Sequence, residues 1–346
     1  MKKRRWGWWL GGLAGLIILL LLRFAPLNSY IETPGTADNL RNFVTMPTRP
    51  DHQKGDFMIT SVYLQRATPL SWVWAHFDPH ASIDSAADVT GGQSGTTYNK
   101  VQQFYMQSAI NEAIATAYQT AHSQYTKKYL GIYVLNVTKN SHFNGEIKVG
   151  DTITKIDGVH YNSAAGYQKA LAKRKLTDRV NVTYEHNGKT KTAKGALIRL
   201  PDGRSGIGIT LTDNVKVTTK IPVMVNPGEI GGPSGGLMFS LQIYQQLTNE
   251  NLRHGQKIAG TGTIGPDGSV GEIGGIDKKI VAANKAGAKI FFAPYVKPTK
   301  ELLKYEPDHM TNYQLAKKTA KKYAPKMKVV PVSSFKQAVR YLQTHH

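Results

Sequence analysis

The sequence predicts a mixed α/β (α+β) chain made of several parts and headed by an N-terminal transmembrane helix. Three observations lead to this class. Residues 6–22 form an uncharged apolar run, residues 129–200 alternate short β-rich runs with turns, and residues 201–346 alternate strand-like with helix-like runs. With 346 residues, the chain is long enough for two or three domains.

The N-terminus predicts a membrane anchor at residues 6–27. The cations at positions 2–5 precede the apolar run, and about 20 apolar residues span a bilayer. Because cations stay on the cytoplasmic side, residues 1–5 are expected to be a cytoplasmic tail. A cleaved signal peptide is the alternative, but "RFAPLNSY" offers no A-x-A-like site. We therefore expect a single-pass protein of the cell membrane whose remaining chain, including any catalytic domain, is extracellular.

Composition restricts the chemistry outside the membrane. The chain has no cysteine, which excludes disulfides, cysteine nucleophiles and thiolate metal sites. Its net charge of +21 suits nucleic acid, anionic lipid or an anionic cell-wall polymer. The cations are scattered and accompany no zinc-finger or RNA-binding motif, so no nucleic-acid partner is expected. No GxxxxGK[ST] loop is present, which indicates no ATPase in this chain.

Residues 28–128 are expected to form an N-terminal extracytoplasmic α/β region. "FMITSVYLQ" (57–65) alternates like a strand, and "TPLSWVWAHF" (68–77) begins with threonine and proline, as helices do. A loop at 88–99 and an amphipathic helix at 100–125 follow. His76 and His80 beside Asp78 are interpreted as exposed or hydrogen-bonded side chains, so neither a metal nor a cofactor is predicted.

Residues 129–200 alternate short strands and turns around one helix near 164–175. "IKVGDTITKIDGV" (147–159) resembles the L-x-x-G-D-x-I-x-x-I-N-G pattern of PDZ domains. The resemblance implies peptide capture by strand addition. "YLGIYV" stands where the family has its carboxylate-binding loop, although it departs from the usual G-L-G-F. The peptide groove is therefore expected at Leu130, Gly131, Ile132 and Tyr133; the alternative is a PDZ fold that serves only as a spacer.

Residues 201–346 read as a compact α/β domain containing a candidate nucleophile. Strands are expected at "SGIGITLTD", "KIPVMVN", "AKIFFAP" and "KVVPV", and a hairpin is expected at "TIGPDGSV". In "GEIGGPSGGLMFS", Ser234 lies in a glycine-rich turn before a predicted helix. Glycines, including Gly235, allow close backbone approach, and a helix beginning at Ser234 directs free N–H groups toward an oxyanion. The alternative is an ordinary N-cap serine.

A serine nucleophile needs a base, and two candidates stand in this region. His254 could complete a triad if it folds back. Lysine is the stronger candidate, because "GGIDKK" begins a helix whose buried stripe starts at Ile276 and Ile280. At about 100° per residue, Lys279 lies roughly 60° from Ile276 and is expected to be partly buried. Lys278 lies about 160° away and is expected to be solvated.

"GGPSGG" and, 45 residues later, the lysine of "GGIDKK" resemble the Ser-Lys proteolytic domain of the Lon family. The resemblance implies Ser234 as nucleophile, Lys279 as general base and Thr261 in support, and it implies ring-forming homo-oligomers. The order anchor, PDZ, Lon domain is similar to the membrane-anchored Lon-like proteases of Gram-positive bacteria, the SepM-type and YlbL-like families. Such enzymes cut peptides or unfolded segments, secreted signalling peptides among them. The alternative is a peptide-binding adaptor with an inactive Lon-like domain.

Overall fold

The computed structural model describes the backbone of residues 2–345 and the side chains of residues 9–10 and 12–345. The chain forms two compact units. Unit 1 comprises Met1–Asn42, Asp51–Gly95 and Asn251–His346. Unit 2 comprises Phe43–Pro50 and Thr96–Glu250. These units do not coincide with the predicted boundaries at 128 and 200, because each is assembled from segments that are distant in sequence.

Unit 1 opens with helix α1 (Lys2–Phe24). Part of the predicted anchor, at residues 6–8 and 11, lies outside the described side chains. Within the part of the chain that is described, no helix is both long and apolar enough to cross a membrane.

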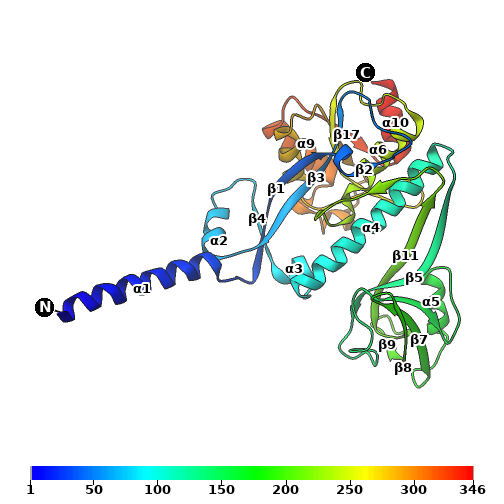
Figure 1. Ribbon diagram of the computed structural model, residues 1–346, viewed down its shortest axis with the longest axis horizontal. Helices are drawn as coiled ribbons and strands as arrows, with labels where there is room; N and C mark the ends of the chain where they lie inside the picture. The colour runs from blue at the N-terminus through cyan, green and yellow to red at the C-terminus, as the bar shows by residue number, and fades with distance from the viewer. Residues whose placement is uncertain (1, 346) are drawn as a thin grey trace. The chain divides into compact units, whose positions relative to one another are not determined.

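A six-stranded mixed sheet with the order β17-β16-β13-β3-β1-β4 forms the centre of unit 1 (Figure 1). The hairpin β1–β3 and its neighbour β4 come from the N-terminal part of the chain, and β13 pairs in parallel with β3. The predicted strands at 57–65, 288–294 and 328–332 are confirmed, the second of them over Ile290–Pro294. The strands are β1 (Ser29–Asn39), β3 (Asp56–Arg66), β4 (Ser82–Ser85), β13 (Lys257–Gly260), β16 (Ile290–Pro294) and β17 (Lys328–Val332).

Helices cover both faces of this sheet. Phe291 packs in one core with Ile276 and Ile280 of α7 and Ala316 of α9, whereas the neighbouring Phe292 meets Tyr341 of α10 edge to face. This alternation along β16 places α7 and α9 on one face and α10 on the other. Besides α1, the helices of unit 1 are α2 (Pro69–Ala75), α3 (Ala86–Thr90), α7 (Ile276–Lys285), α8 (Lys300–Leu303), α9 (Asn312–Tyr323) and α10 (Phe335–Thr344).

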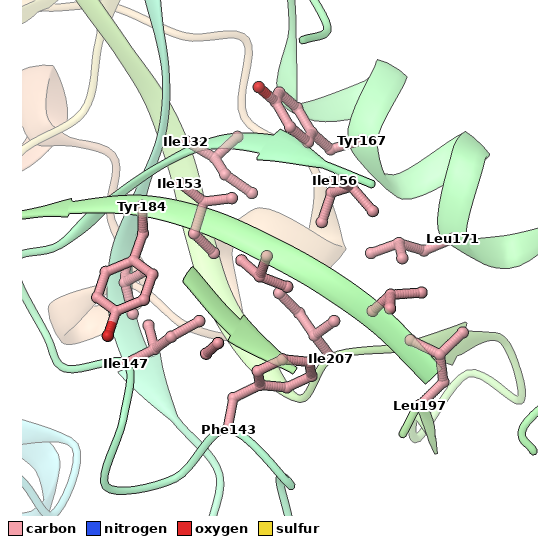
Figure 2. Packing of buried hydrophobic residues seen from close by; sticks show 14 residues of the cluster. Ile132, Phe143, Ile147, Ile153, Ile156, Tyr167, Leu171, Tyr184, Leu197 and Ile207 are labelled. Atoms are coloured by element: carbon pink, nitrogen blue, oxygen red, sulfur yellow. The ribbon is translucent and has the colours of Figure 1, made fainter. Parts of the chain in front are cut away.

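Unit 2 contains a five-stranded antiparallel sheet of order β11-β5-β6-β7-β8, with α5 packed beside it. Figure 2 shows Ile132, Ile153, Phe143 and Ile207 converging on its core. The elements are α4 (Gly95–Thr120), β5 (Tyr125–Val137), β6 (Thr152–Ile156), α5 (Ala164–Ala172), β7 (Arg179–His186), β8 (Lys189–Ala196), β11 (Ile209–Thr219) and α6 (Gly236–Thr248).

Short elements complete the chain. The predicted hairpin is confirmed by β14 pairing with β15, and the predicted strand "KIPVMVN" is reduced to β12. These elements are η1 (Leu40–Asn42), β2 (Val44–Thr45), β9 (Ile198–Arg199), β10 (Ser205–Gly206), β12 (Met224–Val225), η2 (Pro233–Gly235), β14 (Thr263–Ile264), β15 (Val270–Gly271) and η3 (Pro307–His309).

Candidate active site and peptide groove

Ser234 lies in the single turn η2 immediately before α6, in unit 2. Gly232 adopts a φ of 83°, a conformation that favours glycine, and its N–H donates to the Gln102 carbonyl at 2.9 Å. The N-cap of α6 is Gly235, with no side-chain cap. Ser234 is therefore not the N-cap of α6, contrary to the alternative interpretation. It is half-buried directly before the positive end of a 13-residue helix.

Lys279 lies in the second turn of α7, in unit 1. Its side chain is only 3% exposed, and its Nζ donates a 3.2 Å hydrogen bond to Thr261 Oγ1. Thr261 follows β13 and is itself buried, and its N–H bonds to the Phe292 carbonyl. The structure thus brings together the lysine and the threonine that the Lon resemblance named, whereas Ser234 belongs to the other unit.

The surroundings of Lys279 alter its basicity. Burial lowers its pKa from 10.5 to about 8, and the nearby Glu32 carboxylate opposes this change. An amine with this pKa is partly neutral near pH 7, as a general base requires. The pKa of Glu32 is raised, chiefly because burial disfavours its anion, while Lys278 favours it.

The expectation that Lys278 is solvated is wrong. Lys278 is 8% exposed, and its Nζ lies 3.0 Å from Asp277 Oδ2 and 4.0 Å from Glu32 Oε1. Helical phase predicted one covered face, but α7 contacts both the sheet strand β1 and the helix α9. The phase argument was right for Lys279, Ile276 and Ile280, which are all buried. Lys278 is therefore a buried, ion-paired residue.

The predicted peptide groove at Leu130–Tyr133 is also wrong in position. These residues lie on β5, which pairs with β11 along one side. On the other side, Ile132 and Tyr133 pair with Ile153 and Thr152 of β6. Ile132 is 1% exposed and belongs to the domain core. A strand paired on both sides cannot accept an added peptide strand.

The two edge strands of this sheet are β11 and β8, and a cavity lies beside β11. Asp213 Oδ1 of β11 accepts the N–H of Ala164 at 2.7 Å, which ties the first turn of α5 to the strand. Thr138 and Ser141 hold the carbonyls of Gly208 and Ile207 in the loop that enters β11. The cavity is lined by Gln168 and Leu171 of α5, by Leu200, and by residues 204–209 and Leu211.

Sequence reasoning missed this groove, although a signal was present. "SGIGITL" places two glycines around an isoleucine before an alternating strand, but from the sequence this segment is interpreted as a strand of the domain at 201–346. Gly208 has a φ of 76°, and a Cβ there would come within 2.7 Å of Ile198 Cδ1. Only glycine fits this turn.

His254, the alternative base, is hydrogen-bonded elsewhere in the fold. His254 Nε2 lies 3.1 Å from the Leu342 carbonyl, an acceptor, so this nitrogen must carry the proton. His76 Nδ1 contacts the Trp72 carbonyl, and the His80 ring meets that of Tyr323. No group of three potential metal-ligating side chains occurs among the residues described.

Comparisons with known proteins find similarity to a PDZ domain and to named proteases. A family model described as "PDZ domain" matches residues 109–197. The serine protease Do-like HtrA of Lactobacillus helveticus is 45% identical over 60 residues, 17% of this chain and 14% of that protein. The Lon protease of Buchnera aphidicola (subsp. Acyrthosiphon pisum) is 25% identical over 178 residues, 50% of this chain and 22% of that protein.

Among solved structures, the PDZ domain of the SdrC-like protein of Listeria monocytogenes is 33% identical, with a TM-score of 0.24. That match covers 24% of this chain and 90% of the other. The matches to the two proteases span less than a quarter of those proteins' length. The chain contains a PDZ domain and is similar to named proteases over limited segments.

Proposed function

We propose that this protein is a serine endopeptidase in which Ser234 is the nucleophile and Lys279 the general base. The observation that carries the proposal is the buried, hydrogen-bonded Lys279 with a pKa of about 8. A lysine amine of ordinary pKa is too protonated to accept a proton near neutrality. The glycine-rich turn at Ser234, the Lon resemblance and the similarity to named proteases support the same assignment.

The reaction proceeds in two balanced steps. Ser234 Oγ attacks the scissile carbonyl carbon while its proton passes to the neutral Lys279 Nζ, and the C–N bond then breaks as the lysine returns that proton to the leaving amine. Water next attacks the acyl-enzyme, with Lys279 accepting and returning a proton in the same way. N–H groups at the start of α6 stabilise the oxyanion in both steps. Thr261 orients the lysine by accepting its hydrogen bond.

The PDZ domain recruits the substrate in this proposal. An extended peptide adds to the free edge of β11, and its side chains enter the cavity beside α5. Leu171, Leu200 and Leu211 line that cavity, so an apolar peptide side chain is expected there. The substrate class is a peptide or an unfolded segment.

Residues 6–27 anchor the enzyme in the cell membrane, with residues 1–5 in the cytoplasm and the catalytic part outside. The support is the charge-free run from Trp6 to Leu22 after the cations at 2–5. Along α1, large apolar side chains at Leu13 and Leu16 to Leu22 are 42% exposed or more, which is costly in water. The Lon resemblance supports a homo-oligomer.

A serine-directed fluorophosphonate probe followed by peptide mapping tests the proposal. Labelling of Ser234 that disappears in Ser234→Ala, together with loss of cleavage of an unfolded substrate, is expected. Thr248→Ala, at the far end of α6, is the matched control and should retain both. Labelling at another serine would refute the assignment. Peptide binding without labelling or cleavage would instead favour an adaptor.

A further inference from the structure

Helix α2 and the turn after it present an unusual cluster of exposed apolar side chains. Leu70, Trp72, Val73, Trp74 and Phe77 are 42%, 40%, 51%, 66% and 76% exposed. At about 100° per residue, Leu70, Val73 and Trp74 fall within an arc of roughly 100° on one face of α2, whereas Trp72 lies apart from them. Phe77 follows in the turn after the helix. Contiguous apolar surface of this kind marks an interaction site. Neither the proposed catalytic residues nor the peptide groove uses this cluster.

The cluster is held rigidly. Thr68 and Ser71 form a reciprocal capping box at the start of α2, and Pro69 stands in its first turn. Ala75 faces inward and packs in a small core with Ile31 and Ala67. Four of the five exposed side chains are therefore displayed by an ordered helix fixed to strand β1, and Phe77 follows in the turn directly after it.

The neighbourhood of α2 indicates its partner. Helix α1 contacts α2 (Figure 1), and the Leu27 N–H donates to the Ala67 carbonyl at 2.8 Å, next to the start of α2. The exposed apolar surface of α1, which includes Ile18 and Phe24, is thus continuous with the cluster on α2. Because the two apolar surfaces are continuous, we expect the environment that covers α1 to cover the cluster on α2 as well.

Charge and residue type narrow the partner further. Arg23 lies in the last turn of α1, and Arg66 donates from its Nε to the Leu27 carbonyl at an exposed position. Tryptophans beside arginines are typical of the interface between bilayer and water, where an amphipathic ring and a cation both find partners. The carboxylate nearest to α2 in sequence is that of Asp78, which accepts a hydrogen bond from the His80 N–H.

We propose that α2 and the turn after it form a second membrane contact, which inserts Trp74 and Phe77 into the headgroup region of an anionic bilayer beside α1. The proposal shares the lipid surface with the anchoring proposed above, but it concerns different side chains. It commits to lipid and not to a protein partner, because the cluster continues the surface of α1. A second copy of the chain or another protein is an outcome of the test.

The absence of cysteine permits site-specific spin labels on the full chain. Phe77→Cys reports on the turn that follows α2, Ile18→Cys reports on α1, and Tyr305→Cys is the matched control. Tyr305 is an exposed aromatic of unit 1 beside Lys304, and it is 77% exposed against 76% for Phe77. Each labelled protein is placed in vesicles of equal parts phosphatidylglycerol and phosphatidylcholine. Relaxation by oxygen, which concentrates in lipid, is then compared with relaxation by a water-soluble nickel chelate.

The expected result is preferential relaxation by oxygen at positions 18 and 77, weaker at 77, and by nickel at 305. A label at 77 that behaves like the label at 305 would overturn the proposal, even if position 18 reports lipid. Protection of the label at 77 from both reagents would also overturn it, because a protein surface would then cover α2. A label at 77 in lipid with position 18 in water would uphold the role of α2 and refute the proposed anchor.

Discussion

Replacing Lys279 with methionine is expected to stabilise the protein at neutral pH while abolishing peptide cleavage. Lys279 is 3% exposed, and burial lowers its pKa from 10.5 to about 8. Near pH 7 the folded protein therefore holds a largely protonated amine where the charge is disfavoured. Methionine is similar in length and carries no charge, so the variant loses this penalty together with the proposed base.

The size of the effect follows from the two pKa values. A shift from 10.5 to about 8 corresponds to roughly 3 kcal/mol of unfolding free energy, at about 1.4 kcal/mol per unit. Between these values the unfolded state binds more protons than the folded state, so wild-type stability rises with pH. The advantage of the variant should be full below pH 8 and should vanish above pH 10.5. Loss of the hydrogen bond to Thr261 subtracts a constant amount from it.

Urea unfolding followed by circular dichroism, between about pH 7 and pH 10, measures the difference between the two proteins. Lys285→Met removes an exposed lysine from the same helix and controls for the loss of one positive charge. A stability difference for Lys279→Met that stays constant with pH would refute the reasoning, because the buried amine would then not titrate in this window. Cleavage by the variant equal to that of wild type would separately refute its role as base.

Three further predictions follow from the geometry. Leu211→Asp in the groove should raise KM for a peptide bound by the PDZ domain about tenfold or more, with little change in kcat. Thr210→Asp is the control: Thr210 is exposed on the other face of β11, so peptide kinetics should stay unchanged. Glu32→Gln removes the anion that raises the pKa of Lys279, so the rising limb of the pH–rate profile should move to lower pH; a shift to higher pH would contradict this. Asn312→Ala removes two hydrogen bonds to Ile273, one in each direction, and should cost about 2 kcal/mol in chemical denaturation, with an unchanged midpoint counting against it.

Local elements of the candidate site could be predicted from the sequence. The glycine-rich turn before α6, the helix carrying Lys279 and the hairpin at 263–271 all rest on signals within a few residues. Propensity, capping and periodicity act at that range. The burial of Lys279 was predictable for the same reason, since one helix face was marked by Ile276 and Ile280.

Assembly over longer distances could not be predicted in the same way. Ile132 and Ile209 stand in similar glycine-containing segments, and which strand forms the sheet edge depends on pairing partners far away in the chain. Lys278 is buried beside strand β1, where its Nζ lies 4.0 Å from Glu32, a residue more than 240 positions earlier in the chain. Periodicity along one element carries no information about a second neighbour.

The parallel pairing of β3 with β13 has a consequence for how the chain folds. Thr60 Oγ1 bonds to the Gly260 carbonyl across a separation of 200 residues, and closing so long a loop carries an entropic cost and slows folding. Unit 2, nearly continuous from Thr96 to Glu250, can complete its core while residues 251–346 are still being synthesised. Until they arrive, one edge of β3 has no partner strand. A chain interrupted before residue 251 would keep that edge open to other chains, so an aggregated product is expected from truncation there.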